Sequence, residues 1–221
     1  RFDSGFSLQY YRAIIITMSK YICLNNQSHV KESLSIVPIR YEDIFKIMEW
    51  RNQQIYHLRQ NKTLTKEDQE NYFDNVIEGL FHMQNPSQII FSYLEDGKCI
   101  GYGGLVNINW SDRRAEMSFL LDTSLKENKS NYSNYFSVFI KLIKKIAFNE
   151  IEINRVFTET YSFRTNHINI LEENSFILEG SMKEHIYMQK ESKYHDSVLH
   201  GCFKKIMNRK RVFISGGAGV I

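Results

Sequence analysis

Side chains that could carry chemistry are scattered along this chain, and few of them form a set. Cys23, Cys99 and Cys202 stand far apart, without the spacing of a metal or redox site. An odd number of scattered cysteines is typical of a reducing compartment, so we expect a cytoplasmic protein. His185 and His195 could each relay a proton, although a lone histidine is more often a surface residue. These residue types therefore predict no metal centre.

A glycine-rich segment late in the sequence has the residue types of a phosphate site. Gly216 and Gly219 follow a short apolar run at 212–215, and glycines at such a turn let a backbone approach a pyrophosphate at a helix N-terminus. The segment from Met207 resembles the start of an NAD-dependent nucleotide-sugar epimerase or dehydratase. The sequence stops before the helix of such a site, so we expect 206–221 to be a truncated Rossmann-like start or a tail.

The composition indicates one globular domain. The 221 residues are 43% hydrophobic and 24% charged, with a formal net charge of +3, which is a typical globular balance. This charge is too small to indicate nucleic-acid binding, and no apolar run reaches the roughly 18 residues that span a bilayer. Met18 is the first methionine, so we expect residues 1–17 to be an upstream extension and 18–205 to be the domain.

Hydrophobic patterns predict strands and helices in the order β-α-α-β-β-β-α-β-α-β. A first strand near a sheet edge precedes a helix that ends at Arg51 and Asn52, and Thr65 with Asp68 predicts a capped start for the second helix. The clearest helix, 132–148, has an apolar stripe on one face. The strands are expected at 34–40, 89–94, 99–108, 115–121 and 197–203, and 153–180 should form a strand, a short helix and another strand.

Several local sequences in this order resemble the GCN5-related N-acetyltransferase (GNAT) family. Residues 153–180, INRVFTETYSFRTNHINILEENSFILEG, resemble its C-terminal half, in the branch that acts on amino sugars and on protein N-termini such as those of ribosomal proteins. The resemblance covers about 35–205 and implies an α+β, α/β/α-layered acyl-CoA N-acyltransferase fold with a mixed, mostly antiparallel sheet. Matches to amino-sugar N-acetyltransferases are Trp50-Arg51-Asn52 with Thr65 and Tyr72-Phe73, Ile100-Gly101 through Ile108, and Tyr194-His195-Asp196.

The resemblance implies transfer of an acetyl group from acetyl-CoA to a primary amine. The main chain of 117–121 would pair with the pantetheine arm like an added strand. The amine must be neutral when it attacks, and Glu116 is the best candidate base, with an ion pair to Arg113 or Arg114 as the alternative reading. The cofactor contacts expected from this strand are Phe119, Leu120 and Leu121.

The segment that should bind the pyrophosphate departs from the family pattern. This loop is expected at 126–136, but no glycine occurs between Gly104 and Gly180, and a side chain there would obstruct the phosphates. Ser130, Ser133 and the first-turn amides could still bind the anion, and Lys126 and Lys129 could screen its charge. The cofactor contacts expected from this loop are Asn131, Tyr132, Ser133, Asn134, Tyr135 and Phe136.

The tyrosine that protonates the leaving thiolate in this family is also missing. Aligned without gaps, its position is Leu171, which has no proton to give, and the family's asparagine falls at Arg164. A two-residue deletion would place the asparagine at Asn166 instead, so both are kept as cofactor contacts. Tyr161 and Tyr187 are then the candidate acids, and the alternative for each is a half-buried packing residue.

The expected acceptor is a nucleotide-linked amino sugar in the biosynthesis of surface glycans, for a bacterial enzyme with a homodimer as one option for its assembly. Arg51 and Asn52 would face this acceptor, and Arg51 could contact a substrate phosphate or only complement the end of its helix. An acidic acceptor rim would instead favour a protein N-terminus or a polyamine. A non-catalytic GNAT-like domain is the remaining alternative, indicated if Tyr132 or Phe136 fills the pyrophosphate position; an open, amide-lined cleft would indicate the enzyme.

Overall fold

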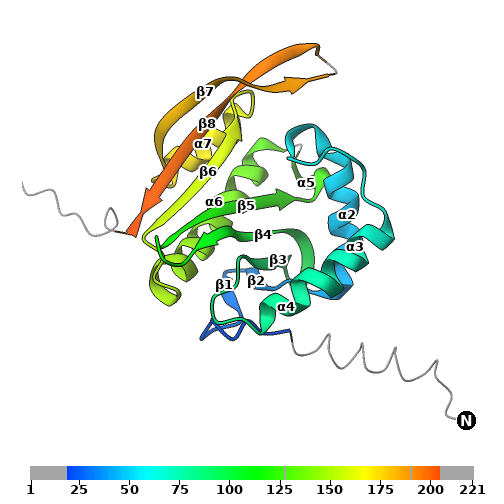
Figure 1. Cartoon of the computed structure of the whole chain (residues 1–221), viewed down its shortest axis with the longest axis vertical. Helices are drawn as coiled ribbons and strands as arrows, with labels where there is room; N and C mark the ends of the chain where they lie inside the picture. The colour runs from blue at the N-terminus through cyan, green and yellow to red at the C-terminus, as the bar shows by residue number, and fades with distance from the viewer. Residues whose placement is uncertain (1–18, 127, 190, 205–221) are drawn as a thin grey trace, which may run out of the picture.

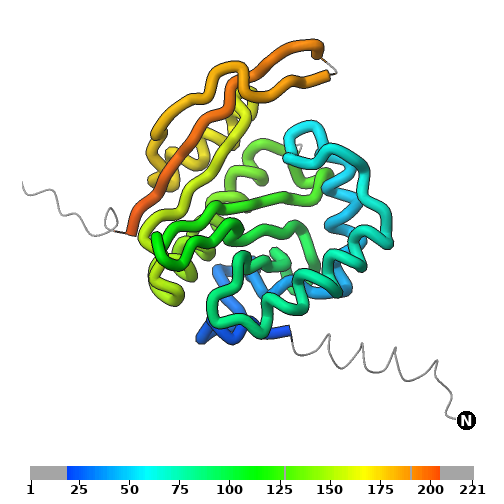
Figure 2. The backbone as a smooth tube through the Cα atoms, viewed as in Figure 1, coloured from blue at the N-terminus to red at the C-terminus, as the bar shows by residue number. Residues whose placement is uncertain are grey.

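One twisted sheet organises the chain. The structure is a computed structural model that describes residues 19–126, 128–189 and 191–204 (Figures 1 and 2). The expectations for 1–17 and 206–221 fall outside these residues. The eight strands lie in the order β1-β2-β3-β4-β5-β6-β8-β7. They are β1 (His29–Lys31), β2 (Leu34–Pro38), β3 (Ile89–Glu95), β4 (Lys98–Asn109), β5 (Arg114–Leu121), β6 (Arg155–Tyr161), β7 (Ile177–Met188) and β8 (Lys193–Phe203).

Helices cover both faces of this sheet. On β4, the Tyr102 hydroxyl is bonded to Arg51 of α2, whereas a side chain added at the neighbouring Gly103 would meet Phe139 of α6. Because successive strand residues point to opposite faces, α2 and α6 lie on opposite sides. The helices are α2 (Ile44–Gln53), α3 (Lys66–Tyr72), α4 (Glu78–Phe81), α5 (Thr123–Lys126), α6 (Lys129–Lys145) and α7 (Thr165–Glu173).

Short 3₁₀ and π turns flank or extend some of these helices. The 3₁₀ turns η1 (Tyr41–Asp43) and η2 (Ile55–His57) flank α2, and the π turns η3 (Phe73–Ile77) and η4 (Ile146–Glu150) extend α3 and α6. Within the described ranges, no helix is long and apolar enough to cross a membrane.

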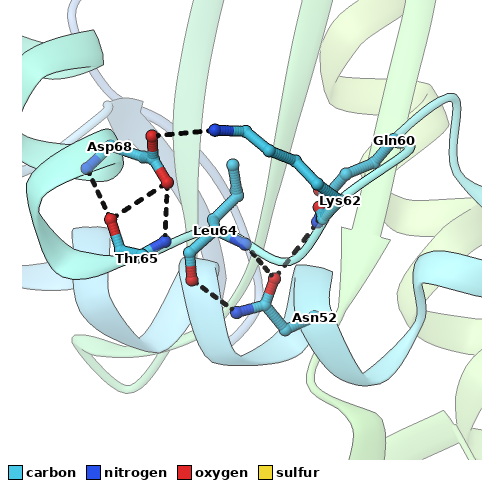
Figure 3. Close-up of polar contacts among 6 residues, drawn as sticks. All are labelled: Asn52, Gln60, Lys62, Leu64, Thr65 and Asp68. Carbon is cyan, nitrogen blue, oxygen red and sulfur yellow. Dashed lines mark hydrogen bonds and ion pairs between the residues drawn. The ribbon is translucent and has the colours of Figure 1, made fainter.

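The predicted α+β fold, with its mixed, mostly antiparallel sheet, is confirmed. The pair β5–β6 is parallel, and the other neighbouring strands are antiparallel. The capped start of α3 is also confirmed: the Thr65 hydroxyl accepts from the Asp68 amide at 3.1 Å, and the Asp68 carboxylate accepts from the Thr65 amide at 2.9 Å (Figure 3).

Two of the differences from the predicted elements have identifiable reasons. The short β1, which the patterns do not predict, pairs with β2 and makes β2 the second strand of the sheet. The long helix α6 starts at Lys129, one turn before the expected Tyr132, because the Asn128 side chain accepts the amides of Ser130 and Asn131.

The feature that positions the site is the divergence of β5 from β6. Their ladder covers only Arg114, Ala115 and Glu116, paired with Arg155, Val156 and Phe157. Beyond Glu116, β5 stays paired with β4, while β6 continues along β8 to Tyr161. Figure 1 shows the two strands spreading apart from this point. The main chain of 117–120 therefore faces an opening instead of a neighbouring strand.

Candidate active site

A cleft occupies the opening between β5 and β6. Its volume is about 210 Å³, and its walls come from β4, β5, β6, the loop after η2, α6 and α7. Residues 116–120 of β5 line one side, and 158–160 of β6 line the other. An extended ligand could therefore lie along the β5 main chain as an added strand does.

Glu116, the predicted base, lies where the ladder ends, with both carboxylate oxygens bonded. Arg59 donates to them from Nη1 at 3.2 Å and Nη2 at 2.7 Å, and Asn107 donates from Nδ2 at 2.8 Å. Asn107 lies in a register shift of β4 and has a left-handed φ of 50°. The partner of Glu116 is thus Arg59, and not Arg113 or Arg114.

A second carboxylate, Glu159 of β6, faces the same arginine. Its Oε2 accepts from Arg59 Nη2 at 2.9 Å, and its Oε1 accepts from the Ser197 hydroxyl at 2.7 Å. Sequence reasoning missed both Glu159 and Arg59. Alternation along β6 could have placed Glu159 on the face of Glu116. No local pattern indicates Arg59, because its loop lies 57 positions from Glu116 in the sequence.

The predicted cofactor strand is only partly available to a ligand. Phe119 and Leu120 line the cleft, as expected. The Leu121 side chain is buried, and its carbonyl accepts from the Gln54 side chain at 2.8 Å. The stretch of β5 that can present its main chain to a ligand is therefore 117–120.

Aromatic rings form the floor of the cleft. Phe136 of α6 is fully buried between Phe119 and His167, with ring centroids 4.6 and 4.2 Å away and nearly parallel planes. The Tyr132 hydroxyl lies 2.8 Å from Nδ1 of His167. Burial lowers the pKa of His167 well below its usual value, and the Arg164 cation adds to this effect. The stack leaves the cleft open above it.

Six residues were expected from the pyrophosphate loop. Phe136 lines the cleft, Tyr132 lines a neighbouring pocket described below, and the other four line neither. Asn131 and Asn134 are exposed on α6. The Ser133 hydroxyl donates to the Lys129 carbonyl at 2.9 Å, and the Tyr135 hydroxyl donates to Glu95 at 3.0 and 3.1 Å. The Asn128 side chain already accepts the Ser130 and Asn131 amides, at 3.0 and 3.2 Å. The start of α6 is thus capped by its own chain.

Next to the cleft lies a pocket of about 290 Å³ that we call the cationic pocket. Lys126, Lys129 and Arg164 line it, and no carboxylate is among the lining residues that the structure describes. Asn166 lies at the start of α7, where Arg164 is the N-cap and no side chain caps the helix. Both alternatives for the family's asparagine, Arg164 and Asn166, therefore line the same pocket.

The cationic pocket fits the phosphates of the expected acetyl-CoA. Lys126 Nζ lies 2.7 Å from the Tyr56 hydroxyl and 2.9 Å from Nε2 of His57. Burial, together with Arg164 and Lys126, lowers the pKa of His57 to about 2, so this ring is neutral. Three cations, with no carboxylate among the described residues around them, suit a ligand of several negative charges. The residues that would hold those phosphates are Lys126, Lys129 and Arg164, in place of glycine amides.

The two candidate acids lie in different surroundings. Tyr161 ends β6 next to the cleft, is 8% exposed, and has a pKa raised by burial. Tyr187 is 51% exposed on the β7–β8 hairpin, where its ring packs against Tyr194, and it is not among the residues that line these pockets. Leu171 is fully buried, which suits a packing role at that position. Neither tyrosine lines the cleft itself, but Tyr161 directly follows the cleft residues 158–160, whereas Tyr187 lies out on the hairpin.

A third pocket, of about 420 Å³, lies between α2, α3 and the sheet, and we call it the α2–α3 pocket. Arg51 lines both this pocket and the cleft, and it donates to the Tyr102 hydroxyl at 2.5 Å and to Gln60 at 2.9 Å. Asn52 has another role. Its side-chain amide donates to the Leu64 carbonyl and accepts from the Leu64 amide and the Gln60 side chain (Figure 3). Arg51 therefore faces the site, whereas Asn52 holds the loop.

The arrangement can support proton transfer and anion binding. Among the residues that the structure describes, no group of three or more His, Cys, Asp and Glu side chains is placed to hold a metal ion. A carboxylate pair lies at one end of the cleft, and the cationic pocket lies at the other. An amine could lose its proton at the first end while a phosphorylated ligand is held at the second.

Comparisons with known proteins identify the family and the fold. A family model described as an acetyltransferase (GNAT) domain matches residues 36–199. The fold is similar to that of a spermidine N-acetyltransferase from Vibrio cholerae in complex with CoA and spermine, with a TM-score of 0.66 and 14% identity over 79% of this chain and 98% of that one. A dodecameric structure of spermidine N-acetyltransferase from Vibrio cholerae in an intermediate state gives 0.64 and 17%, over 81% and 99%. No curated protein matches the sequence.

The family match spans the sheet from β2 to β8 and includes the whole cleft. Acetyl transfer to an amine is the reaction that the resemblance implied, and the open cleft with its cationic pocket agrees with it. The chain therefore belongs to the GNAT acetyltransferase family and is an N-acetyltransferase that uses acetyl-CoA as its co-substrate.

Proposed function

We propose that this enzyme acetylates the primary amine of a nucleotide-linked amino sugar. The observation that carries the proposal is the position of Arg51 on the wall shared by the cleft and the α2–α3 pocket. A phosphate group of the acceptor could pair with this guanidinium while the amine enters the cleft. The rest of the α2–α3 pocket is mostly apolar, with tyrosine and glutamine side chains that suit a sugar or a base.

The charge of the α2–α3 pocket argues against a polycation as the acceptor. Asp68 is the carboxylate that lines it, and this side chain already accepts bonds from Lys62 and from Thr65 (Figure 3). A polyamine would need several carboxylates to balance its charges, and a protein N-terminus has no need of the arginine. The solved neighbours act on spermidine, but at 14–17% identity they support the fold and not the acceptor.

Each part of the site then has a role in the transfer. When bound, acetyl-CoA supplies the activated acetyl group. Lys126 and Arg164 hold its phosphates, and the main chain of 117–120 orients its extended arm. Glu116 takes the proton of the acceptor amine, a step worth about 10²- to 10⁴-fold in rate. Tyr161, at the open end of β6, gives a proton to the departing sulfur.

A thiol-release assay with three acceptor classes tests the proposed function. UDP-linked amino sugars should give a higher kcat/KM than spermidine or a peptide with a free N-terminus. Arg51→Gln should raise KM for the UDP-linked sugar about tenfold, the effect of one charge-assisted contact. The same change should leave KM for the free amino sugar unaltered, and Arg51→Lys should lie between. A clear preference for spermidine would refute the sugar assignment. The homodimer stays a prediction, which sedimentation velocity can check.

A further inference from the structure

Arg59 links β5 and β6 at the end of the cleft where the two strands diverge. Its guanidinium bonds Glu116 on β5 through two nitrogens, at 2.7 and 3.2 Å, and Glu159 on β6 through one of them, at 2.9 Å. The side chains of Glu116 and Glu159 are 11% and 17% exposed, whereas that of Arg59 is 51% exposed. A half-exposed cation is thus held by two carboxylates that are largely buried at the diverging strands.

The two carboxylates are fixed from behind by other partners. Asn107 donates to Glu116 at 2.8 Å, and Ser197 donates to Glu159 at 2.7 Å. The loop that carries Arg59 is held separately, because Asn52 bonds the Leu64 main chain and the Gln60 side chain (Figure 3). The Arg59 side chain can therefore leave the carboxylates while the loop and both glutamates stay in place.

A primary ammonium has the chemistry that this position requires. It is a cation with three N–H donors, and the two carboxylates at present receive three N–H bonds from one guanidinium. Leaving two buried carboxylates without a cation is costly, so one cation must replace the other. Arg59 and Asn107 together take three of the roughly four lone-pair sites of the Glu116 carboxylate. The resting contact thus stands between the acceptor and most of the group proposed as the base.

We infer that Arg59 occupies the place of the acceptor's ammonium group and that the acceptor displaces it. The inference rests on the proposed function only in that the acceptor is a primary amine. After the exchange, the ammonium N–H bond breaks and its proton passes to the Glu116 carboxylate. The nitrogen keeps the electron pair and becomes neutral. Arg59 is thus a positioning residue that keeps a cation beside the carboxylate pair until an amine arrives.

Steady-state kinetics with the acceptor that the thiol-release assay identifies tests the exchange. If Arg59 holds the pair in about nine-tenths of the molecules, its removal should lower the acceptor KM about tenfold. Arg59→Gln should show this change with KM for acetyl-CoA unaltered, and Arg59→Lys should restore the wild-type KM. Lys183→Gln is the matched control, since it removes an ion pair with Asp196, neither residue lines the cleft or the α2–α3 pocket, and it should change neither constant. A higher acceptor KM in Arg59→Gln would overturn the inference.

A second measurement needs no turnover. In protein labelled with ¹⁵N at arginine, the Arg59 guanidinium signal, assigned by its loss in Arg59→Lys, should exchange its protons slowly. Methylammonium should speed this exchange, whereas tetramethylammonium at equal concentration should not, because it lacks N–H donors. Equal effects of the two salts would show that Arg59 is a fixed structural contact, which an amine does not displace. If methylammonium releases Arg59 but no amino sugar is acetylated, the proposed function fails and the inference stands.

Discussion

The two ends of the cleft are built in different ways. At the amine end, Glu116 and Glu159 are carried by strands, next to the point where the β5–β6 ladder stops. At the phosphate end, Lys126 and Arg164 extend from short helical segments over an aromatic floor. The divergence of the strands is a property of the sheet and survives without glycines. The proposed contacts to phosphate would depend on side chains, and there this chain differs most from the family pattern.

The amine end should show the largest effect of a single substitution. Glu116→Gln keeps the shape of the side chain but cannot take a proton, so kcat should fall about 10²- to 10³-fold with little change in KM for acetyl-CoA. Steady-state thiol release measures both constants. Asp112→Asn, at an exposed carboxylate that pairs with Arg114, is the control. A kcat within about threefold of wild type would remove Glu116 from the chemistry.

The phosphate end should respond in binding and not in kcat. Arg164→Gln removes one of the three cations of the cationic pocket, and the Kd for CoA should rise about tenfold, as for one charge-assisted contact. Isothermal titration calorimetry measures this constant without any acceptor. Lys145→Gln, at an exposed lysine late in α6, should leave it unchanged. An unchanged Kd in Arg164→Gln would mean that the phosphates lie elsewhere.

Buried histidines at the phosphate end should make stability depend on pH. Burial lowers the pKa of His57 to about 2, so the unfolded chain binds a proton below about pH 6.5 that the folded chain does not. The stability of the folded state is therefore unaffected by His57 above that pH. Below it, the free energy of unfolding falls by up to about 1.4 kcal/mol per pH unit. Urea unfolding between pH 7 and 5 should show a shallower loss for His57→Gln than for His82→Gln, at an exposed histidine. Equal slopes would contradict the neutral ring.

Local patterns were sufficient for the parts of the fold that depend on neighbouring residues. The Thr65 cap, the strands of the central sheet and the long helix α6 follow from short-range periodicity and capping. Glu116 was predicted as the base because it begins the strand that the resemblance assigns to the cofactor. Tyr132 and Phe136 share the buried face of α6 at helical spacing, and that signal indicates floor residues, which the loop alignment obscured.

The rest of the site depends on contacts between distant segments. Arg59 reaches Glu116 and Glu159 from a loop, and the sequence separations are 57 and 100 residues. Asn52 has a suitable position for an acceptor contact, but the amide is used by the loop it supports. Neither periodicity nor a motif encodes such pairings, because they arise only when the sheet and α2 are packed together.

The cleft and the cationic pocket should bind acetyl-CoA although the glycine loop is missing. A thermal-shift titration with acetyl-CoA and with free CoA tests it most directly, because a ligand that binds only the folded state raises its stability. We expect saturable stabilisation by both ligands, with a weaker response in Arg164→Gln. No shift at millimolar concentrations of either ligand would contradict it.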